Sequence, residues 1–384
     1  MINNLNISTE IELIIECCKT TKNNQKLTEY INKIEDWDSF IPLAYSHGIF
    51  PLVYRSLKEF QQLIPDDIFI RMKQHYMDIV KQNMLMTSEL IKVVKILEEN
   101  NIESISFKGP VLSQLAYGDV VSRQYCDLDI LVDENELKKA QNILENNNYK
   151  QLYNLEEYQK ENLKKVVHDI SMINKINNIN IELHWTLSSG EFFIDLEKLK
   201  YFEDIKKYTI SNQNINIFLN EKLFIYLCVH GYKHLWERIE WLVDIYYLIE
   251  KKSIDIEKVI EMSKSINAER IVLSTLIICK KIFDLEIILE KDILNDKKLN
   301  RVTNKMLEKI FEDYLVLKEK NHTKQFSIIH LYMLKTTANK LKYFKTFLLP
   351  TEHDYEKVRI SSNFHFLYYL LRPFNILKRI LFKS

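Results

Sequence analysis

The sequence predicts an α+β fold in which a small mixed β-sheet is flanked by helical regions, with helix in the majority. Only five glycines and six prolines occur in 384 residues, which leaves little material for the turns of a hairpin-rich protein. Helical spacing of apolar residues dominates both ends of the chain, and strand-like runs gather between them. We therefore expect an amino-terminal helical region at 1–99, a sheet-containing core at 100–195 and a carboxy-terminal helical domain at 196–384.

Apolar periodicity locates the expected helices. Before the core they cover 8–20, 37–62 and 67–99. From Leu196 onward the pattern is again helical, and it is strongest near 220–250, 255–284, 304–319 and 325–345.

The core opens with a strand, a turn and a helix. The run SISF at 104–107 has the length and composition of a buried strand. Lys108, Gly109 and Pro110 follow, and proline suits the first turn of a helix because its missing N–H is no loss there. Gly118 is expected to end that helix.

Three more strands are expected in the core. They are CDLDILV at 126–132, VVHDISMIN at 166–174 and NINIELHW at 178–185, and the last two are close enough to form a hairpin. Between the first two, Asp133 and Glu136 have the spacing of a capping box that opens a helix.

Composition restricts the classes of function. Lys plus Arg and Asp plus Glu both number 53, so the net charge is zero and general attraction to nucleic acid is not indicated. Five scattered cysteines without a CxxC pair indicate reduced thiols and a cytoplasmic location. The amino terminus lacks the pattern of a signal peptide, and no uncharged apolar run of 18 residues predicts a membrane span.

Two carboxylates stand in an apolar strand. Alternation places Asp127 and Asp129 on one face of the strand and Leu128 on the other. Carboxylates this close repel each other unless a cation neutralises them, and Mg²⁺ is the ion that such oxygen ligands prefer. Glu182 projects from the polar face of a later strand and would complete a three-carboxylate site if the strands are neighbours.

The lysine–glycine turn indicates an anion site. Backbone N–H groups at a helix start bind anions, and glycine at 109 lets a phosphate approach closely. Lys108 adds a point charge for a phosphate oxygen. A phosphate site beside a metal-binding strand is typical of phosphoryl or nucleotidyl transfer.

These residues resemble the nucleotidyltransferase family of the DNA polymerase β superfamily, in its poorly characterised bacterial branch. The resemblance is carried by an ordered set of motifs: Lys108-Gly109, Arg123, the D-x-D of 127–129, the E-L-H-W of 182–185 and HGYKHLW at 230–236. It extends to LAYSHGIFPLVYRSL at 43–57 and to the tail. Pro110 stands where the superfamily has a serine, and Glu182 where aspartate is more common.

The resemblance implies a fold, a reaction and a site. The core at 100–195 would be the nucleotidyltransferase fold, and Asp127, Asp129 and Glu182 would hold two Mg²⁺ ions. Lys108, Gly109 and Arg123 would bind a nucleoside triphosphate. A hydroxyl or phosphate of an acceptor would attack the α-phosphorus, take an NMP, most readily AMP from ATP, and release pyrophosphate.

Four further polar residues are candidate contacts to the acceptor or to phosphate. They are His184, His230, Lys233 and His234. His184 is equally well explained as a hydrogen-bonded structural histidine. His230 and His234 have HxxxH spacing, which suits zinc, but the glutamate of the protease motif is absent, so a polar stripe facing the cleft is the preferred interpretation.

The acceptor stays open between a small molecule, a peptide or protein, and tRNA. The tRNA acceptor is disfavoured because RNA binding usually needs a basic face. An alternative of another class is a degenerate nucleotide- or peptide-binding protein, for which the serine missing at Pro110 is the main support. The tail from Phe366 is a basic amphipathic helix that suits a membrane surface, a partner or, as we prefer, the protein's own helices.

Overall fold

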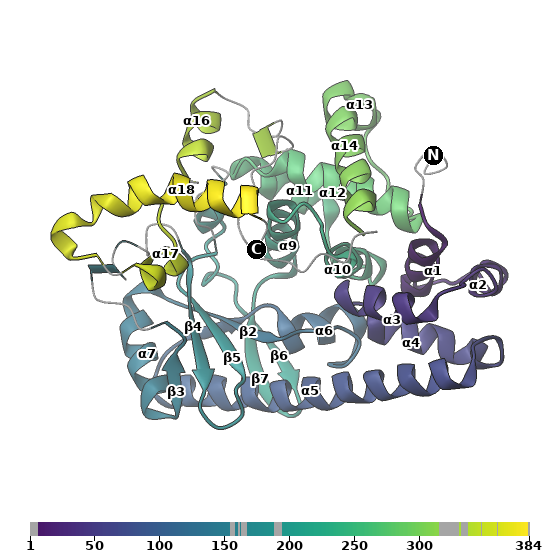
Figure 1. Ribbon diagram of the computed structural model, residues 1–384, viewed down its shortest axis with the longest axis horizontal. Helices are drawn as coiled ribbons and strands as arrows, with labels where there is room; N and C mark the ends of the chain where they lie inside the picture. The colour runs from purple at the N-terminus through teal and green to yellow at the C-terminus, as the bar shows by residue number, and fades with distance from the viewer. Residues whose placement is uncertain are drawn as a thin grey trace.

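The computed structural model describes residues 7–153, 158–159, 162, 167–187, 194–314, 330–331, 337–346, 348–358 and 360–382. Within these residues the predicted α+β class is confirmed: helices predominate around one five-stranded sheet and one hairpin (Figure 1). No helix among the described residues combines the length and apolar character needed to cross a bilayer.

The five-stranded sheet has the order β1-β2-β5-β4-β3. The pair β2 and β5 is parallel, and the other three pairs are antiparallel, so the sheet is mixed as predicted. Its strands are β1 (Ser104–Ser106), β2 (Asp127–Val132), β3 (Tyr149–Gln151), β4 (Asp169–Asn174) and β5 (Asn180–His184). The predicted hairpin of the two last strands is confirmed as β4 and β5.

Helices surround the sheet on its two sides and at its end. The helices before and within the core are α1 (Thr9–Cys18), α2 (Asn24–Ile31), α3 (Trp37–Ser46), α4 (Phe50–Leu57), η1 (Lys58–Leu63), α5 (Asp66–Glu99), α6 (Gly109–Tyr117), η2 (Glu134–Glu136) and α7 (Leu137–Asn146). Those that follow are η3 (Leu196–Leu199), α9 (Asn220–Lys233), α10 (Ile239–Glu250), α11 (Ile256–Ser265), α12 (Glu269–Phe283), α13 (Lys291–Asn295), α14 (Lys297–Tyr314), α16 (Thr337–Thr346), α17 (Glu352–Lys357), η4 (Ser362–Phe364) and α18 (Phe366–Phe382).

Alternation along the strands separates an apolar face from a polar face. Leu128, Ile130, Ile181 and Leu183 are buried together with the carboxy-terminal half of α5 and with α7. The residues between them on β2 and β5 therefore project from the opposite face of the sheet. Figure 1 shows α5 running beneath the whole molecule and α9 on the other side of the sheet.

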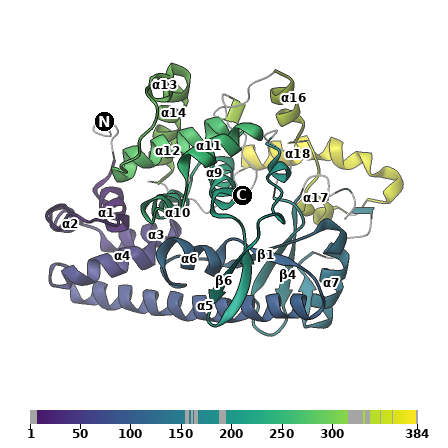
Figure 2. The ribbon, with the colours of Figure 1, turned by 180° about the vertical axis from the view of Figure 1, so that it is seen from behind.

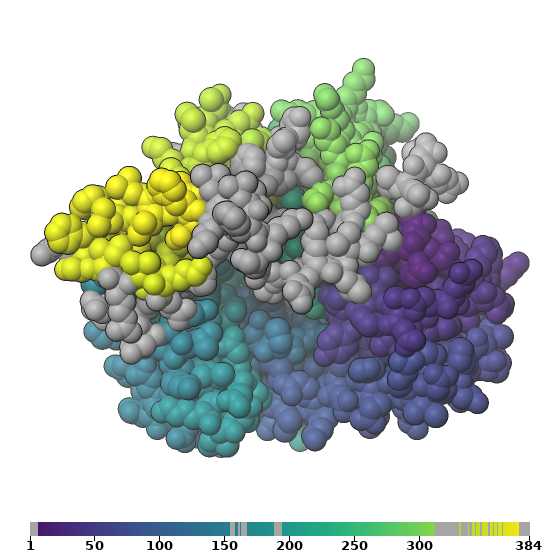
Figure 3. Space-filling view, viewed as in Figure 1, coloured from purple at the N-terminus to yellow at the C-terminus, as the bar shows by residue number. Residues whose placement is uncertain are grey.

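The helices before and after the sheet region pack together in one buried hydrophobic cluster. Its buried side chains come from α1 to α5, from α9 to α12 and from α14, and side chains of β1, α6 and β2 also contribute. Polar contacts join the same parts: the Lys19 Nζ lies 2.7 Å from an Asp284 carboxylate oxygen, and the Thr20 Oγ1 lies 2.8 Å from the Tyr246 hydroxyl. Figures 2 and 3 show these helical parts side by side at one end of the molecule, with α18 at the other.

The expectation of continuous helix from Leu196 onward is wrong for one segment. Strands β6 (Lys206–Ile210) and β7 (Gln213–Ile217) form a hairpin, and the two turn residues Ser211 and Asn212 have positive φ angles of 47° and 67°. This left-handed geometry is that of a two-residue hairpin turn. Alternating isoleucines in QNINI carried the signal, and Ile215 and Ile217 are buried against β1 and α5.

Other departures are local. Asp133 accepts a hydrogen bond from the Asn135 N–H, but it caps the 3-10 turn η2 rather than α7 itself. The predicted helix at 37–62 breaks at Gly48, which has a φ of 72°. Two further helices were expected at 304–319 and 325–345. Parts of both, at 315–329 and 332–336, lie outside the described residues.

Gly231 leaves space for a buried tryptophan. The Trp236 side chain is fully buried, and a Cβ atom at 231 would lie 2.0 Å from its ring. We expect Gly231→Ala to lower the free energy of unfolding by about 3 kcal/mol, because the ring is confined and overpacking is costly. Urea denaturation measures this loss. Trp236→Leu should lower the free energy of unfolding less in the Gly231→Ala variant than in wild type. Equal losses in the two backgrounds would contradict the steric explanation.

A buried carboxylate on α5 fixes the turn between β4 and β5. The Glu89 side chain accepts hydrogen bonds from the Tyr149 hydroxyl, from the Asn174 Nδ2 at 2.6 Å and from the Asn177 Nδ2 at 2.8 Å. Burial opposes the charge of Glu89, but these donors outweigh it and lower the pKa of its carboxyl below the ordinary 4.5.

We expect Glu89→Gln to destabilise the protein by about 2 kcal/mol at neutral pH, since a charged acceptor is lost. A lowered folded-state pKa contributes stability that is present above the unfolded pKa and is lost as pH falls through the folded pKa. The difference from wild type should therefore shrink in acid. Chemical denaturation at pH 7 and near pH 3.5 measures it, with the exposed Glu98→Gln on the same helix as control. A difference independent of pH would contradict this account.

Candidate active site

Parallel pairing of β2 with β5 brings the predicted carboxylates together. Asp129 is the cross-strand partner of Glu182, and Asp127 is the partner of Asn180. The His184 Nε2 lies 3.2 Å from the Asp129 Oδ1 and 3.6 Å from the Glu182 Oε2. Asp129 and His184 are almost fully buried, whereas the Glu182 side chain is 28% exposed. The site is therefore closed to solvent at Asp129 and His184 and open to solvent at Glu182.

The lysine–glycine turn borders the same cluster. The Lys108 Nζ lies 2.9 Å from the Asp129 Oδ1, and Lys108 is the residue that directly precedes α6. Gly109 has a φ of 51°, and a Cβ atom there would lie 3.4 Å from the Asp127 carbonyl oxygen. Glycine is therefore required by the backbone conformation, because other residues are strained at this φ. The turn lies directly against β2, as the predicted phosphate site requires.

The electrostatics of the cluster are strongly perturbed. Burial and the neighbouring carboxylates Asp129 and Glu182 raise the pKa of Asp127 to about 7. Burial also opposes the charge of Asp129, but Lys108 and His184 outweigh it and hold the pKa of this carboxyl well below its usual range. Burial disfavours a charged His184, yet its hydrogen bonds with the carboxylates raise its pKa to about 9. Lys108 and His184 thus neutralise part of the acidic charge.

The donor set fits a divalent cation. Ligand atoms of Asp129, Glu182 and His184 lie within 4.8 Å of one another. The Asp129 Oδ2 is buried and makes no hydrogen bond within the described residues. A buried carboxylate oxygen without a partner is costly, and a metal ion would satisfy it.

Comparison with known protein families decides the class. A family model described as "Uncharacterised nucleotidyltransferase" matches residues 33–284, which is well over half of the chain. The chain belongs to this nucleotidyltransferase family. Curated proteins include no match to it. The matched range runs from the loop before α3 to the residue after α12, so all the strands in the described part of the chain and the cluster described above lie within it.

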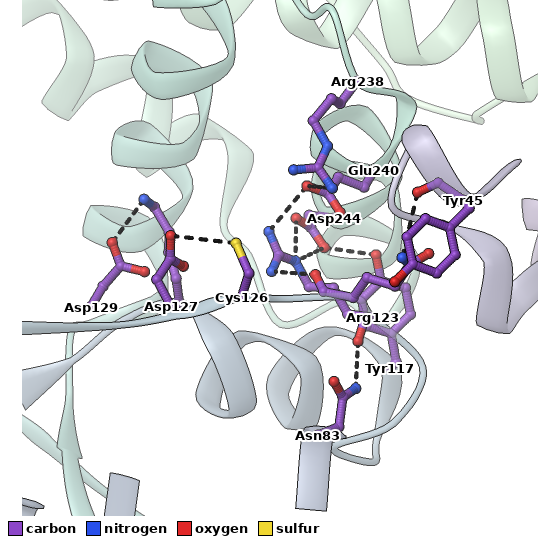
Figure 4. A network of polar contacts seen from close by, with 12 residues as sticks. Tyr45, Asn83, Tyr117, Arg123, Cys126, Asp127, Asp129, Arg238, Glu240 and Asp244 are labelled. Atoms are coloured by element: carbon purple, nitrogen blue, oxygen red, sulfur yellow. Dashed lines mark hydrogen bonds and ion pairs between the residues drawn. The ribbon is translucent and has the colours of Figure 1, made fainter. Parts of the chain in front are cut away.

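The nucleotidyltransferase pairs Arg123 with two carboxylates of α10. Its buried guanidinium pairs with Asp244 of α10, at 3.0 Å from Nε to Oδ2, and its Nη2 lies 3.8 Å from the Glu240 Oε1. The Tyr117 hydroxyl donates to the same Asp244 carboxylate at 2.7 Å. Figure 4 shows Arg123 turned toward Asp244 and Glu240, with Cys126 between this network and Asp127 and Asp129. In this arrangement Arg123 connects the core to α10, and the predicted nucleotide contact stays a prediction.

The Tyr226 ring lies between Lys108 and His230 of α9. The Lys108 Nζ lies 5.6 Å from the centre of the Tyr226 ring, which stacks on His230. Burial, followed by the charge of Lys108, lowers the pKa of His230 well below its ordinary value, so this imidazole is neutral. The His230 and His234 ring centres are 4.9 Å apart, and both rings pack against Trp241.

Lys233, the last residue of α9, affects the pKa of a further carboxylate, Asp169. Burial raises the pKa of Asp169, against the opposing charges of His184 and Lys233. Of the four candidate acceptor contacts, His184 lies against the Asp129 and Glu182 carboxylates, and His230 and His234 pack on Trp241. Their roles stay predictions.

Asp169 was not considered from the sequence, and His168 was considered as a possible site residue but not selected. Asp169 opens β4 as the cross-strand partner of His184, and the His168 Nε2 lies 3.6 Å from its carboxylate. A single Asp at a strand start is an ordinary solvated feature, so the pattern gave little reason to select it. The signal that could have found it is the hairpin register, which places 169 opposite 184 when the turn is centred on 176 and 177.

Proposed function

We propose that this transferase is a Mg²⁺-dependent enzyme of the Lys-Gly branch of the polymerase β superfamily that transfers an NMP to an acceptor hydroxyl or phosphate. AMP from ATP is the favoured donor group. The observation that carries the proposal is the convergence of Lys108, Asp129 and Glu182 on the parallel pair β2 and β5, where Asp129 and Glu182 face each other in the middle of the register. The charge and polarity of this cluster suit a triphosphate with its metal ions.

The residues of the chain would divide the work as follows. Asp127, Asp129 and Glu182 would hold Mg²⁺, which would neutralise part of the negative charge of the phosphates. Lys108 would exchange its contact with Asp129 for one with a phosphate oxygen, and the start of α6 would bind the same group. The acceptor oxygen forms a bond to the α-phosphorus, the bond to the β-phosphate oxygen breaks, and pyrophosphate leaves while the acceptor proton passes to solvent.

Labelling identifies both substrates in one experiment. The purified protein is incubated with cell extract and with ATP, GTP, CTP or UTP labelled at the α-phosphate. We expect one nucleotide, most readily ATP, to label a small molecule, a protein or tRNA, and the labelled fraction identifies the acceptor class. Absence of label from all four nucleotides, with wild-type protein that is folded, would contradict the proposal.

Nucleotide binding should depend on the metal. Because a ligand that binds only the folded state stabilises it, we expect ATP with Mg²⁺ to add about 2.7 kcal/mol at one hundred times its Kd. Thermal unfolding should show a higher Tm with both present and little change with either alone. The double variant Asp127→Asn with Asp129→Asn should lose this increase. An increase that ATP produces without Mg²⁺, and that the double variant retains, would favour a binding protein without catalysis.

A further inference from the structure

Two histidines and an aspartate meet where β4 begins and β5 ends. Asp169 and His184 are cross-strand partners, and His168 precedes Asp169. The His168 and His184 ring centres are 5.5 Å apart. One ligand atom from each of the three residues lies within 4.8 Å of the other two. This group shares His184 with the Asp129 and Glu182 cluster, but its other two members, His168 and Asp169, are not part of that cluster.

The geometry and chemistry of this group suit a transition metal. Two ligands of a tetrahedral ion bound at the usual zinc distances are separated by about 3.4 Å. The His168 Nε2 and the Asp169 Oδ1 are 3.6 Å apart. Two imidazoles with one carboxylate select zinc or similar ions over Mg²⁺, which prefers oxygen alone. His168 and Asp169 are 23% and 21% exposed, so an ion can enter from solvent.

His184 provides a second, independent observation. Its side chain is only 2% exposed, and its Nε2 contacts Asp129 and Glu182. Its Nδ1 is buried and has no hydrogen-bond partner within the described residues. A histidine that binds a metal through one nitrogen commonly contacts a carboxylate through the other. A metal ion bound at the Nδ1 would replace the proton of this nitrogen.

We propose that His168, Asp169 and His184 form a site for one divalent transition-metal ion of the zinc type. The site is distinct from the Mg²⁺ site proposed for Asp127, Asp129 and Glu182, and it does not require nucleotidyl transfer. The bound ion would join the first residues of β4 to the end of β5 and would fix the His184 ring beside Asp129. A fourth ligand from solvent completes a tetrahedral ion.

Equilibrium dialysis of the full chain against Zn²⁺, with Mg²⁺ in excess to fill the oxygen site, tests this. We expect wild type to bind one Zn²⁺, and His168→Gln and Asp169→Asn to weaken the affinity by about a hundredfold. Two matched controls, His75→Gln at an exposed position of α5 and Asp133→Asn directly after β2, should bind as wild type does. Equal binding by His168→Gln, Asp169→Asn and the controls would overturn the proposal.

A spectroscopic variant covers the case in which these substitutions unfold the protein. His168→Cys retains a metal ligand, so its Co²⁺ complex should gain the intense absorption of a cobalt–thiolate bond. Absence of that absorption from folded His168→Cys would overturn the proposal. Loss of Zn²⁺ from Asp129→Asn but not from His168→Gln would also overturn it, because the ion would then belong to the carboxylates of β2. Neither readout depends on nucleotidyl transfer, so failure here and failure of the proposed function are distinguishable.

Discussion

Asp129→Asn should lower the rate of nucleotidyl transfer by about a thousandfold, which corresponds to roughly 4 kcal/mol of transition-state stabilisation. The buried Asp129 lies between Lys108 and His184, and one of its oxygens has no partner within the described residues. Replacing the carboxylate by an amide removes the charge that a metal ion needs. The amide oxygen can still accept a hydrogen bond from Lys108, so the substitution is less disruptive than an apolar one. Initial rates with labelled ATP measure the effect.

The control for this variant lies directly after the same strand. Asp133 follows the last residue of β2, is exposed and caps the turn η2, for which asparagine serves equally well. Asp133→Asn therefore makes the same chemical change without touching the cluster, and it should keep wild-type activity. A similar loss in both variants would indicate a general effect on the strand. Full activity in folded Asp129→Asn would exclude this carboxylate from catalysis.

Asp244→Ala should destabilise the protein by about 4 kcal/mol, because it leaves the Arg123 guanidinium buried without its main counter-ion. Asp244 is fully buried on α10, accepts from both Arg123 and Tyr117, and lies 121 residues from the arginine in sequence. Glu240, whose Oε1 lies 3.8 Å from the Arg123 Nη2, would remain as a weaker counter-ion. Denaturation in urea measures the loss.

A double-mutant cycle separates the two roles of Arg123. If the arginine acts through Asp244, then Arg123→Met with Asp244→Leu should be more stable than Asp244→Ala alone, since both charges are removed together. The KM for the nucleotide should then remain near the wild-type value. A KM that rises in Arg123→Met while Asp244→Leu leaves it unchanged would instead support the nucleotide contact predicted from the sequence.

The fold class and most of the site could be predicted because their signals are local. Alternation in DLDILV shows which face carries Asp127 and Asp129, and the scarcity of glycine indicates helices around a small sheet. The hairpin β6–β7 was missed because its alternation is short and lies within a mainly helical stretch. Arg123 could not be assigned a partner, since its position in the sequence contains no information on which distant carboxylate it meets.

The sequence by itself determined which side chains share a strand face and where a glycine must adopt a left-handed turn, because strand periodicity and backbone sterics act over a few residues. Only the tertiary structure decided that β2 lies parallel to β5, with Asp129 opposite Glu182, and that Asp169 faces His184. Strand order and register are decided by how the apolar face packs on α5 and α7, which involves residues far apart in the chain. The neighbours of each charged side chain, and hence its pKa, follow from that packing.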